Sequence, residues 1–233
     1  TTGNPYWLDL GSTNDWALFD GRSRKPSINQ NSIVVSVKPN KLINSVAILN
    51  IEANSLNITA VSDSAGVVFN EDIDLRRLVN NFYDWFFSSI ERIDNAVRLT
   101  LPAYTDMTIT ITLTGNEVRV GEFIIGKQIR LGCTQYGLGI SINDYSTKET
   151  DIFGNSFVVE RAFADRIEYD VLLENNMVNT VKRFLSQYRA TPLVYIGDER
   201  LEETITYGFF KRFSLVIQDF STSQLVLEVE ELQ

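Results

Sequence analysis

The chain of 233 residues has a formal net charge of −9 at pH 7, from 21 basic and 30 acidic residues. This balance argues against specific or general nucleic-acid binding, because contacts to phosphates require a basic face. The chain has no histidine and one cysteine, so a serine or cysteine nucleophile would lack its usual histidine base. Its 44% hydrophobic and 22% charged residues indicate a folded protein.

The sequence contains no glycine-rich phosphate loop and no metal-binding motif that would imply a cofactor. Asp9, Asp15 and Asp20 are the best calcium candidates, but their spacing is not that of an EF-hand, so we interpret them as turn formers. We therefore expect no enzymatic activity, no cofactor and no metal. No apolar run approaches the ~18 residues of a membrane span, so we also expect no membrane insertion.

Short alternating segments dominate the first half of the chain. Apolar and polar residues alternate over 32–38, which predicts a half-buried strand. The same period predicts strands at 44–50, 56–61, 67–69, 96–101, 107–113 and 118–125, with a turn at Gly115–Asn116. A series of about eight to ten short strands is typical of a β-sandwich or jelly roll, in which two antiparallel sheets each bury one face.

The segment from Asp72 to Ile90 is compatible with two structures. Its apolar residues fit helical spacing, with Asp72 or Asp74 as the N-cap. The aromatic run 83–87 fits a strand equally well. We favour a short helical turn at 73–80 that is followed by a strand.

The pattern changes after Gly126, where a glycine-rich stretch begins. Strands are predicted at 129–131, 140–142, 157–159, 167–173, 193–196, 209–217 and 225–229. Between them, residues 176–189 form an amphipathic helix, with Asn175 or Asn176 as its cap and Pro192 beyond its end. Its apolar stripe consists of Val178, Val181, Leu185 and Tyr188.

These elements predict a mainly β chain of two domains. Residues 1–126 are expected to form an N-terminal jelly-roll β-sandwich. Residues 127–233 are expected to form a C-terminal β-sandwich with one α-helix.

Two groups of residues are candidates for binding. Aromatic side chains can stack on a sugar, although in a sandwich they more often belong to the core; the candidates are Trp7, Trp16 and Trp85. The polar stretch Asn143–Asn155 is too long for a tight hairpin, and we interpret it as an assembly arm. Its candidate contact residues are Asp144, Tyr145, Lys148, Asp151 and Phe153.

Three other features have simpler interpretations. Cys133 lies among apolar or small residues and is expected to be buried and inert. The basic cluster Arg22, Arg24 and Lys25 is expected to be a solvated turn. The last acidic cluster is expected to be a solvated edge rather than a pair of glycosidase acids; it consists of Glu228, Glu230 and Glu231.

Several segments resemble a group of tailed-bacteriophage proteins. They are Tyr6–Gly21, Ile43–Ala47, Arg130–Gly137, Arg189–Pro192 and Tyr195–Gly197. The resemblance implies a component of the phage tail tip or baseplate. It also implies a first part similar to a galactose-binding-type jelly roll, and a second part similar to the β-sandwich-plus-helix unit of tail tube and distal tail proteins.

We therefore expect a structural protein of the virion tail, made in the cytoplasm of the bacterial host. It would assemble with other phage tail proteins, as a homo-oligomeric ring or a subunit attached to a ring. The alternative is a carbohydrate-binding receptor module of the tail that recognises a host-surface glycan. An enzyme of unknown type is a third, weaker hypothesis.

Overall fold

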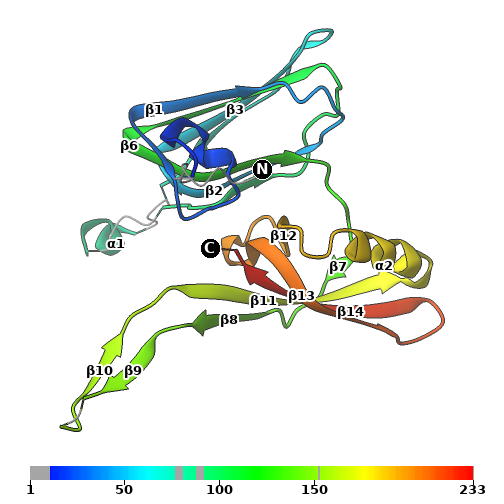
Figure 1. Ribbon diagram of the computed structural model, residues 1–233. Coiled ribbons are helices and arrows are strands. Elements are labelled where there is room, and N and C mark those ends of the chain that lie inside the picture. Colours follow the sequence, from blue (N-terminus) through cyan, green and yellow to red (C-terminus); the bar gives the residue numbers. More distant parts are fainter. Residues whose placement is uncertain (1–10, 77–80, 88–91, 152, 233) are drawn as a thin grey trace, which may run out of the picture. The chain divides into compact units, whose positions relative to one another are not determined.

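A computed structural model describes residues 11–76, 81–87, 92–151 and 153–232 of the chain (Figure 1). It is 55% strand and 12% helical, with two curled antiparallel sheets and one longer helix, which confirms the predicted fold class. The chain divides into two compact units, Thr1–Lys127 and Gln128–Gln233. Among the described residues, no helix is long and apolar enough to cross a membrane.

One six-stranded antiparallel sheet forms the first unit. Its strands are β1 (Ser27–Val37), β2 (Ser45–Glu52), β3 (Ser55–Ser62), β4 (Gly66–Asp74), β5 (Ala96–Arg98) and β6 (Met107–Gly126). They follow the order β4-β3-β6-β2-β5, and β1 also pairs with β6. A 3-10 helix, η1 (Asn14–Phe19), precedes β1. This part therefore contains fewer and longer strands than the sequence predicts.

Strand β6 organises this sheet because it is 20 residues long and pairs with three other strands. Its first half pairs with β1 and β3, and its second half pairs with β1 and β2. The predicted turn at Gly115–Asn116 is wrong, since β1 pairs with β6 on both sides of that dipeptide. Buried residues from both halves, such as Ile111 and Val120, belong to one core.

Strands β1 and β6 pair through a bulge, in which the two residues 115–116 of β6 lie opposite Asn31 of β1. The register of the two strands shifts between Gln30 and Ser32, and Asn31 between them has a φ of 69°. A bulge of this kind bends the strand that contains it and increases its twist. Residues of β1 on both sides of Asn31 line the surface beside η1 that is described below.

Residues 73–87 differ from the prediction. Strand β4 runs to Asp74, residues 77–80 lie outside the described residues, and Phe82–Phe87 form the short helix α1. The rings of Phe82 and Phe86 lie 4.8 Å apart, as do those of Tyr83 and Phe87. Contacts between residues four apart stabilise a helix, and here they prevail over the strand preference of aromatic residues. The predicted strand after residue 80 is therefore wrong.

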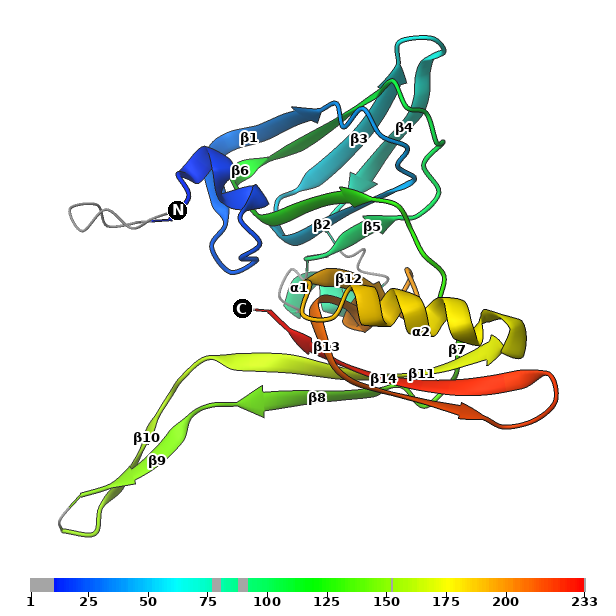
Figure 2. The same ribbon diagram turned by 45° about the vertical axis from the view of Figure 1, so that its right-hand side comes forward.

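The second unit contains one main sheet, a two-stranded ribbon and a helix (Figure 2). The sheet has the order β12-β13-β14-β11-β7, and β8 also pairs with β11. The strands are β7 (Cys133–Thr134), β8 (Gly139–Asp144), β11 (Phe163–Glu174), β12 (Leu193–Ile196), β13 (Ile205–Ile217) and β14 (Thr222–Glu231). The ribbon is made of β9 (Thr147–Thr150) and β10 (Ser156–Val159). Residues 129–131 do not form the predicted strand.

Helix α2 (Val178–Gln187) follows the 3-10 turn η2 (Asn175–Met177) and packs on the sheet. Val181 and Leu185 of the predicted stripe are buried in the core of this unit. The predicted cap is wrong, because no side chain caps the helix. Asn175 instead accepts a hydrogen bond from Ser223 Oγ at 2.5 Å and donates to the Asp219 carbonyl at 2.9 Å. It thereby ties the start of the helix to the β13–β14 turn.

The predicted acidic edge is wrong, because β14 lies between β13 and β11 inside the sheet. Glu228 forms an ion pair with Arg166 at 3.0 Å. Glu230 is buried and pairs with Lys211. Cationic neighbours on the adjacent strands compensate these carboxylates and allow them to lie within a sheet.

Cys133 is exposed, contrary to the prediction. It belongs to β7, a two-residue strand that pairs with Val171 and Leu172 of β11. A Cβ added at Gly132 would lie 2.5 Å from the Leu172 carbonyl oxygen, so the glycine permits this close approach. Gly132, the small residue before Cys133, allows the backbone to approach β11 closely at the margin of the sheet. The residues around Cys133 do not bury its thiol.

The burial of α2 leads to a stability prediction. Replacing Leu185, which is 1% exposed, in the variant Leu185→Ala should lower the free energy of unfolding of the second unit by about 2–5 kcal/mol, because it leaves a cavity under the helix. Urea unfolding followed by circular dichroism measures this loss. The exposed neighbour provides the control Gln187→Ala; an equal loss in both variants would contradict the packing described here.

Candidate interaction sites

A long hairpin arm leaves the sheet of the second unit (Figures 1 and 2). We define the arm as residues 144–163, which join β8 to β11 through β9 and β10. Its pairing shifts by one residue, because Asp144 pairs with Phe163 whereas Thr147 pairs with Val159, so that two residues of one side lie opposite three of the other. Between these pairs, the Tyr145 N–H donates to the Ala162 carbonyl at 3.2 Å. The predicted assembly loop is thus an extended ribbon and not an irregular loop.

Hydrogen bonds fix the base of the arm to the sheet. Glu230 on β14 accepts from Asn143 Nδ2 at 3.1 Å and from Tyr145 Oη at 3.4 Å, and it also pairs with Lys211. The Ser146 N–H donates to Asp144 Oδ1 at 2.8 Å. The pKa of Asp144 is lowered first by the side-chain hydrogen bond of Ser146 and then by this backbone hydrogen bond. These contacts fix the direction in which the arm leaves the sheet.

The tip of the arm is built around Asp151. Its Oδ1 accepts from the backbone N–H groups of Phe153 and Asn155, both at 2.8 Å, and its Oδ2 accepts from Asn155 Nδ2 at 2.9 Å. Hydrogen bonding to Asn155 is the main cause that lowers the pKa of Asp151. This turn presents the Phe153 side chain, which is 82% exposed. Of the predicted arm residues, Asp151 has a structural role, while Lys148 is exposed on β9.

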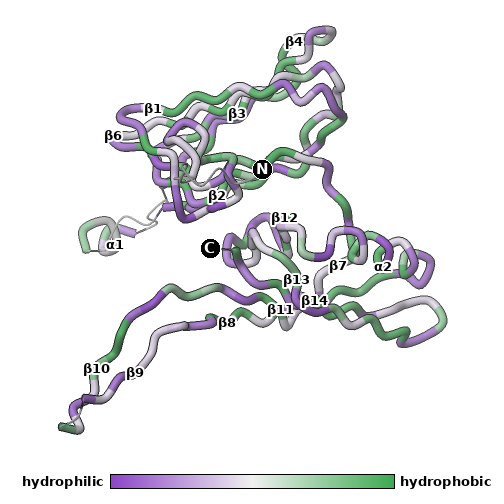
Figure 3. Tube along the Cα trace, in the orientation of Figure 1, coloured by the Kyte–Doolittle hydropathy of each residue, from purple (hydrophilic) through white to green (hydrophobic). Residues whose placement is uncertain are grey.

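Hydrophobic residues occur along the arm as well as at its tip, between hydrophilic ones (Figure 3). Phe157 and Val158 of β10 are exposed, as is Phe163 at the base. Ile140 and Ile142 are exposed on the adjoining β8. An isolated two-stranded ribbon is only marginally stable in water, and exposed apolar patches mark interaction sites. The arm thus has the features of a segment that binds another surface.

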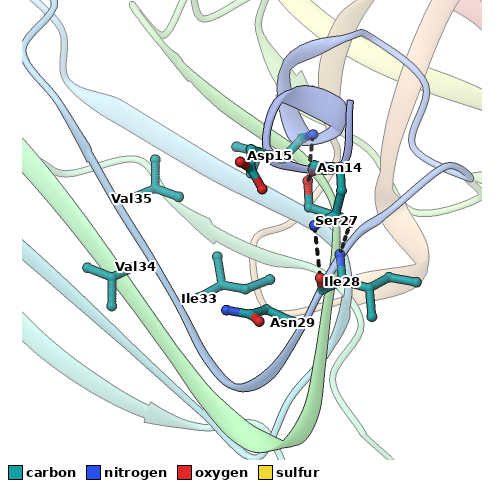
Figure 4. A pocket seen from close by; sticks show the side chains of 9 residues that line it. Asn14, Asp15, Ser27, Ile28, Asn29, Ile33, Val34 and Val35 are labelled. Carbon is teal, nitrogen blue, oxygen red and sulfur yellow. Dashed lines mark hydrogen bonds between the residues drawn. The ribbon is translucent and has the colours of Figure 1, made fainter. Parts of the chain in front are cut away.

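The second candidate surface lies around η1 in the first unit (Figure 4). Trp16 is 66% exposed, and its ring lies 6.0 Å from that of Phe19. Phe19 in turn contacts Phe123 of β6 at 5.9 Å between centroids. Of the three predicted stacking residues, Trp16 is on the surface, while Trp7 and the Trp85 side chain lie outside the described residues.

A pocket of about 240 Å³ lies between η1 and β1. Its walls are Asn14, Asp15, Leu18, Ser27, Ile28, Asn29, Ile33, Val34 and Val35. Asn14 exchanges two hydrogen bonds with the Ile28 backbone, at 2.8 and 2.9 Å. Ser27 Oγ donates to the Asn14 carbonyl at 2.5 Å and accepts from the Leu18 N–H at 3.1 Å. These polar groups therefore hold η1 on β1 and are already bonded within the chain.

Asp20 is the acidic residue of this region whose hydrogen bonds indicate its role. Asp20 accepts from Ser12 Oγ at 2.6 Å and from the Arg22 N–H at 2.9 Å, as a turn-forming residue does. Asp9 lies outside the described residues. No group of three or more metal-ligating side chains occurs in the part of the chain that the structure describes.

The turn after η1 docks on the sheet through Glu122, a buried carboxylate on β6. Its Oε2 accepts from the Gly21 N–H at 3.1 Å. Asn50 Nδ2 donates to the Ser23 carbonyl at 2.8 Å, and a Cβ added at Gly121 would lie 2.1 Å from that carbonyl oxygen. Burial, followed by the nearby negative charge of Asp20, raises the pKa of Glu122 to about 7.

The sequence interpretation assigned the aromatic run 83–87 to a strand, and so it missed the helical face of α1 on which Phe82, Tyr83 and Phe87 are exposed. Their spacing contains the signal, since residues four apart fall on the same side of a helix.

In comparisons with known proteins, no family model and no curated protein matches the chain.

The buried Glu122 predicts a pH dependence of stability. Between its usual pKa of 4.5 and about 7, the unfolded chain loses the proton while the folded chain keeps it, so stability falls as pH rises. Glu122→Gln should remove this fall. The variant should therefore gain stability relative to the natural chain as pH rises from below 4.5 to above 7, as measured by urea unfolding. The control is Glu117→Gln, at an exposed position of the same strand; a difference independent of pH would contradict the prediction.

Proposed function

We propose that the protein is a structural component of a bacteriophage tail tip or baseplate that assembles with itself or with other tail proteins. It would be made in the host cytoplasm and become part of the virion tail, without a catalytic role. The observation that supports this proposal best is the arm, a ribbon that is fixed at its base and exposes apolar side chains at its tip and on β10. The resemblance of several segments to tail proteins adds the biological context.

The arm favours assembly because its exposed residues have little stabilising contact within the chain. Phe153 and Phe157 offer large apolar surfaces, and aromatic side chains often dominate the energy of protein interfaces. Burying them on a neighbour would release this surface from water and order the ribbon. A neighbouring tail subunit is therefore the proposed partner of the arm.

The margin of the sheet supports the same interpretation. Strand β8 lies at the margin of the main sheet, where it pairs with β11 along one of its two edges. Within the described residues, its other edge has no partner strand. Ile140 and Ile142 are exposed beside it. Soluble proteins protect strand edges by charge, bulges or cover, because open edges pair with other strands. An apolar margin on β8 is consistent with cover by another subunit.

Truncation of the arm tests this proposal. The structure allows residues 148–158 to be replaced by Asn-Gly, which closes the hairpin between the paired Thr147 and Val159. The truncated protein should fold, but it should lose its oligomeric state and fail to enter tails. Light scattering and complementation of a gene-deleted phage measure both effects.

A variant with point substitutions tests whether the aromatic side chains of the arm, rather than its length, are needed for assembly. Phe153→Ser/Phe157→Ser should weaken assembly in the same way. The control Phe220→Ser changes a fully exposed ring on the β13–β14 turn and should leave assembly unchanged. Normal, infectious tails containing the truncated protein would show that the arm is not an assembly element.

The alternative function, recognition of a host-surface glycan, is favoured by one observation. Trp16 exposes two thirds of its surface beside Asn14 and Asp15 on η1. An exposed indole ring next to polar side chains can stack on a sugar. The internal hydrogen bonds of Asn14 and Ser27 leave few polar groups to orient such a ligand, so assembly remains our first proposal.

If the alternative is correct, binding of the protein to a glycan array should be lost in Trp16→Ala with the fold intact. The matched control is Tyr136→Ala, which removes an exposed ring from the second unit. Equal binding by the natural chain and Trp16→Ala would exclude Trp16 as the stacking residue.

A further inference from the structure

The aromatic helix α1 has one contiguous face. At 100° per residue, Phe82, Phe86, Tyr83 and Phe87 fall within an arc of about 140°. Phe82, Tyr83 and Phe87 are 78%, 70% and 74% exposed. Since an aromatic side chain buries 150–250 Å² in an interface, this face offers on the order of 500 Å². One side of a stable interface needs about 800 Å², so the face is large enough to form its centre.

The pocket between η1 and β1 is the complementary feature in the same unit (Figure 4). Leu18, Ile33 and Val35 give it apolar walls, and its volume is about 240 Å³. A cavity of ~150 Å³ is enough to hold a benzene molecule, so one aromatic ring fits. Ile28 and Val34 add exposed apolar surface at the rim.

The polarity of the pocket also favours an aromatic guest. Asn14 and Ser27 already bond within the chain, so an apolar ring would leave neither of them unsatisfied. The rim also includes the carboxylate of Asp15. A tyrosine hydroxyl can donate a charge-assisted hydrogen bond to a carboxylate, which would fix the orientation of the guest.

We propose that the aromatic face of α1 in one copy of the chain docks into the η1 pocket of a second copy. The inference rests on the proposed self-assembly and names one of its contacts. A ring of Phe82 or Phe87 enters the pocket, and Tyr83 donates its hydroxyl proton to Asp15. Within one copy the rings of Phe82 and Phe87 are exposed, so they do not fill their own pocket.

The geometry of this contact is head-to-tail, because the donor face and the acceptor pocket are different surfaces. Such a contact continues from copy to copy, and it closes into a ring when the rotation between neighbours allows it. A lipid surface is a less suitable occupant. The chain has a net charge of −9, which is repelled by the anionic lipids of bacterial membranes.

Complementary variants of the full chain test this contact. Phe82→Ser/Phe87→Ser removes the guest and keeps the pocket. Val34→Glu places a charge at the exposed rim and keeps the guest. Each variant alone should self-associate at least about tenfold more weakly than the natural chain in sedimentation velocity. An equimolar mixture should associate more strongly than either variant alone, because it retains one intact face and one intact pocket. The control Phe220→Ser should associate like the natural chain.

The outcomes distinguish this contact from the function of the arm. If the α1 and rim variants associate like the natural chain while arm truncation abolishes assembly, the α1 contact is wrong and the proposed function stands. A natural chain that stays monomeric up to about 100 μM would overturn the inference, because even weak interfaces associate there. It would also be overturned if phosphatidylglycerol vesicles bound the natural chain but not Phe82→Ser/Phe87→Ser, and the mixed variants associated no more strongly than each variant alone.

Discussion

The pairing of β6 along its whole length is the constraint on which the first unit depends. A strand of 20 residues has its two halves in different surroundings, yet both contribute to one core. The partner strands must follow its course, and β1 does so across a bulge at which Asn31 lies opposite the two residues 115–116 of β6. Asn14 of η1 bonds to Ile28, on the stretch of β1 that pairs with the second half of β6. The pocket beside η1 is therefore a result of how the sheet is paired.

The second unit buries its core under a helix instead of along one long strand. Its core lies between one face of the sheet and α2, and a single helix of this length covers only part of that face. Ile140 and Ile142, at the β8 side, are exposed. The chain then extends the same pair of strands into the arm, where apolar residues have no core to join. Glu230 at the base of the arm is held by Lys211, so a buried charge is used to fix direction rather than to add stability.

Local periodicity predicted the class of the fold and the helix, because both depend on neighbours in sequence. The alternation in β6 and the stripe through Val181 and Leu185 are of this kind. The continuity of β6 across Gly115–Asn116 could not be read from the sequence, because long-range pairing with β1 overrides a local turn signal. The position of β14 inside the sheet, which determines the environment of Glu228 and Glu230, is likewise a matter of topology. The arm was identified because the polar stretch 143–155 is too long for a tight hairpin. The aromatic run of α1 was instead assigned to a strand.

Net charge and exposed aromatic surface have opposite effects on association, and their balance bears on the proposed self-assembly. A charge of −9 keeps separate copies apart through long-range repulsion. That repulsion is screened over about 10 Å at moderate salt, whereas burial of aromatic rings acts only at contact. Phe153 at the arm tip and Phe87 on α1 are both exposed. Association is therefore expected to strengthen as ionic strength rises, because salt weakens the repulsion and leaves the apolar contacts intact. An interface held mainly by ion pairs would show the reverse dependence, so a salt titration separates the two kinds of contact.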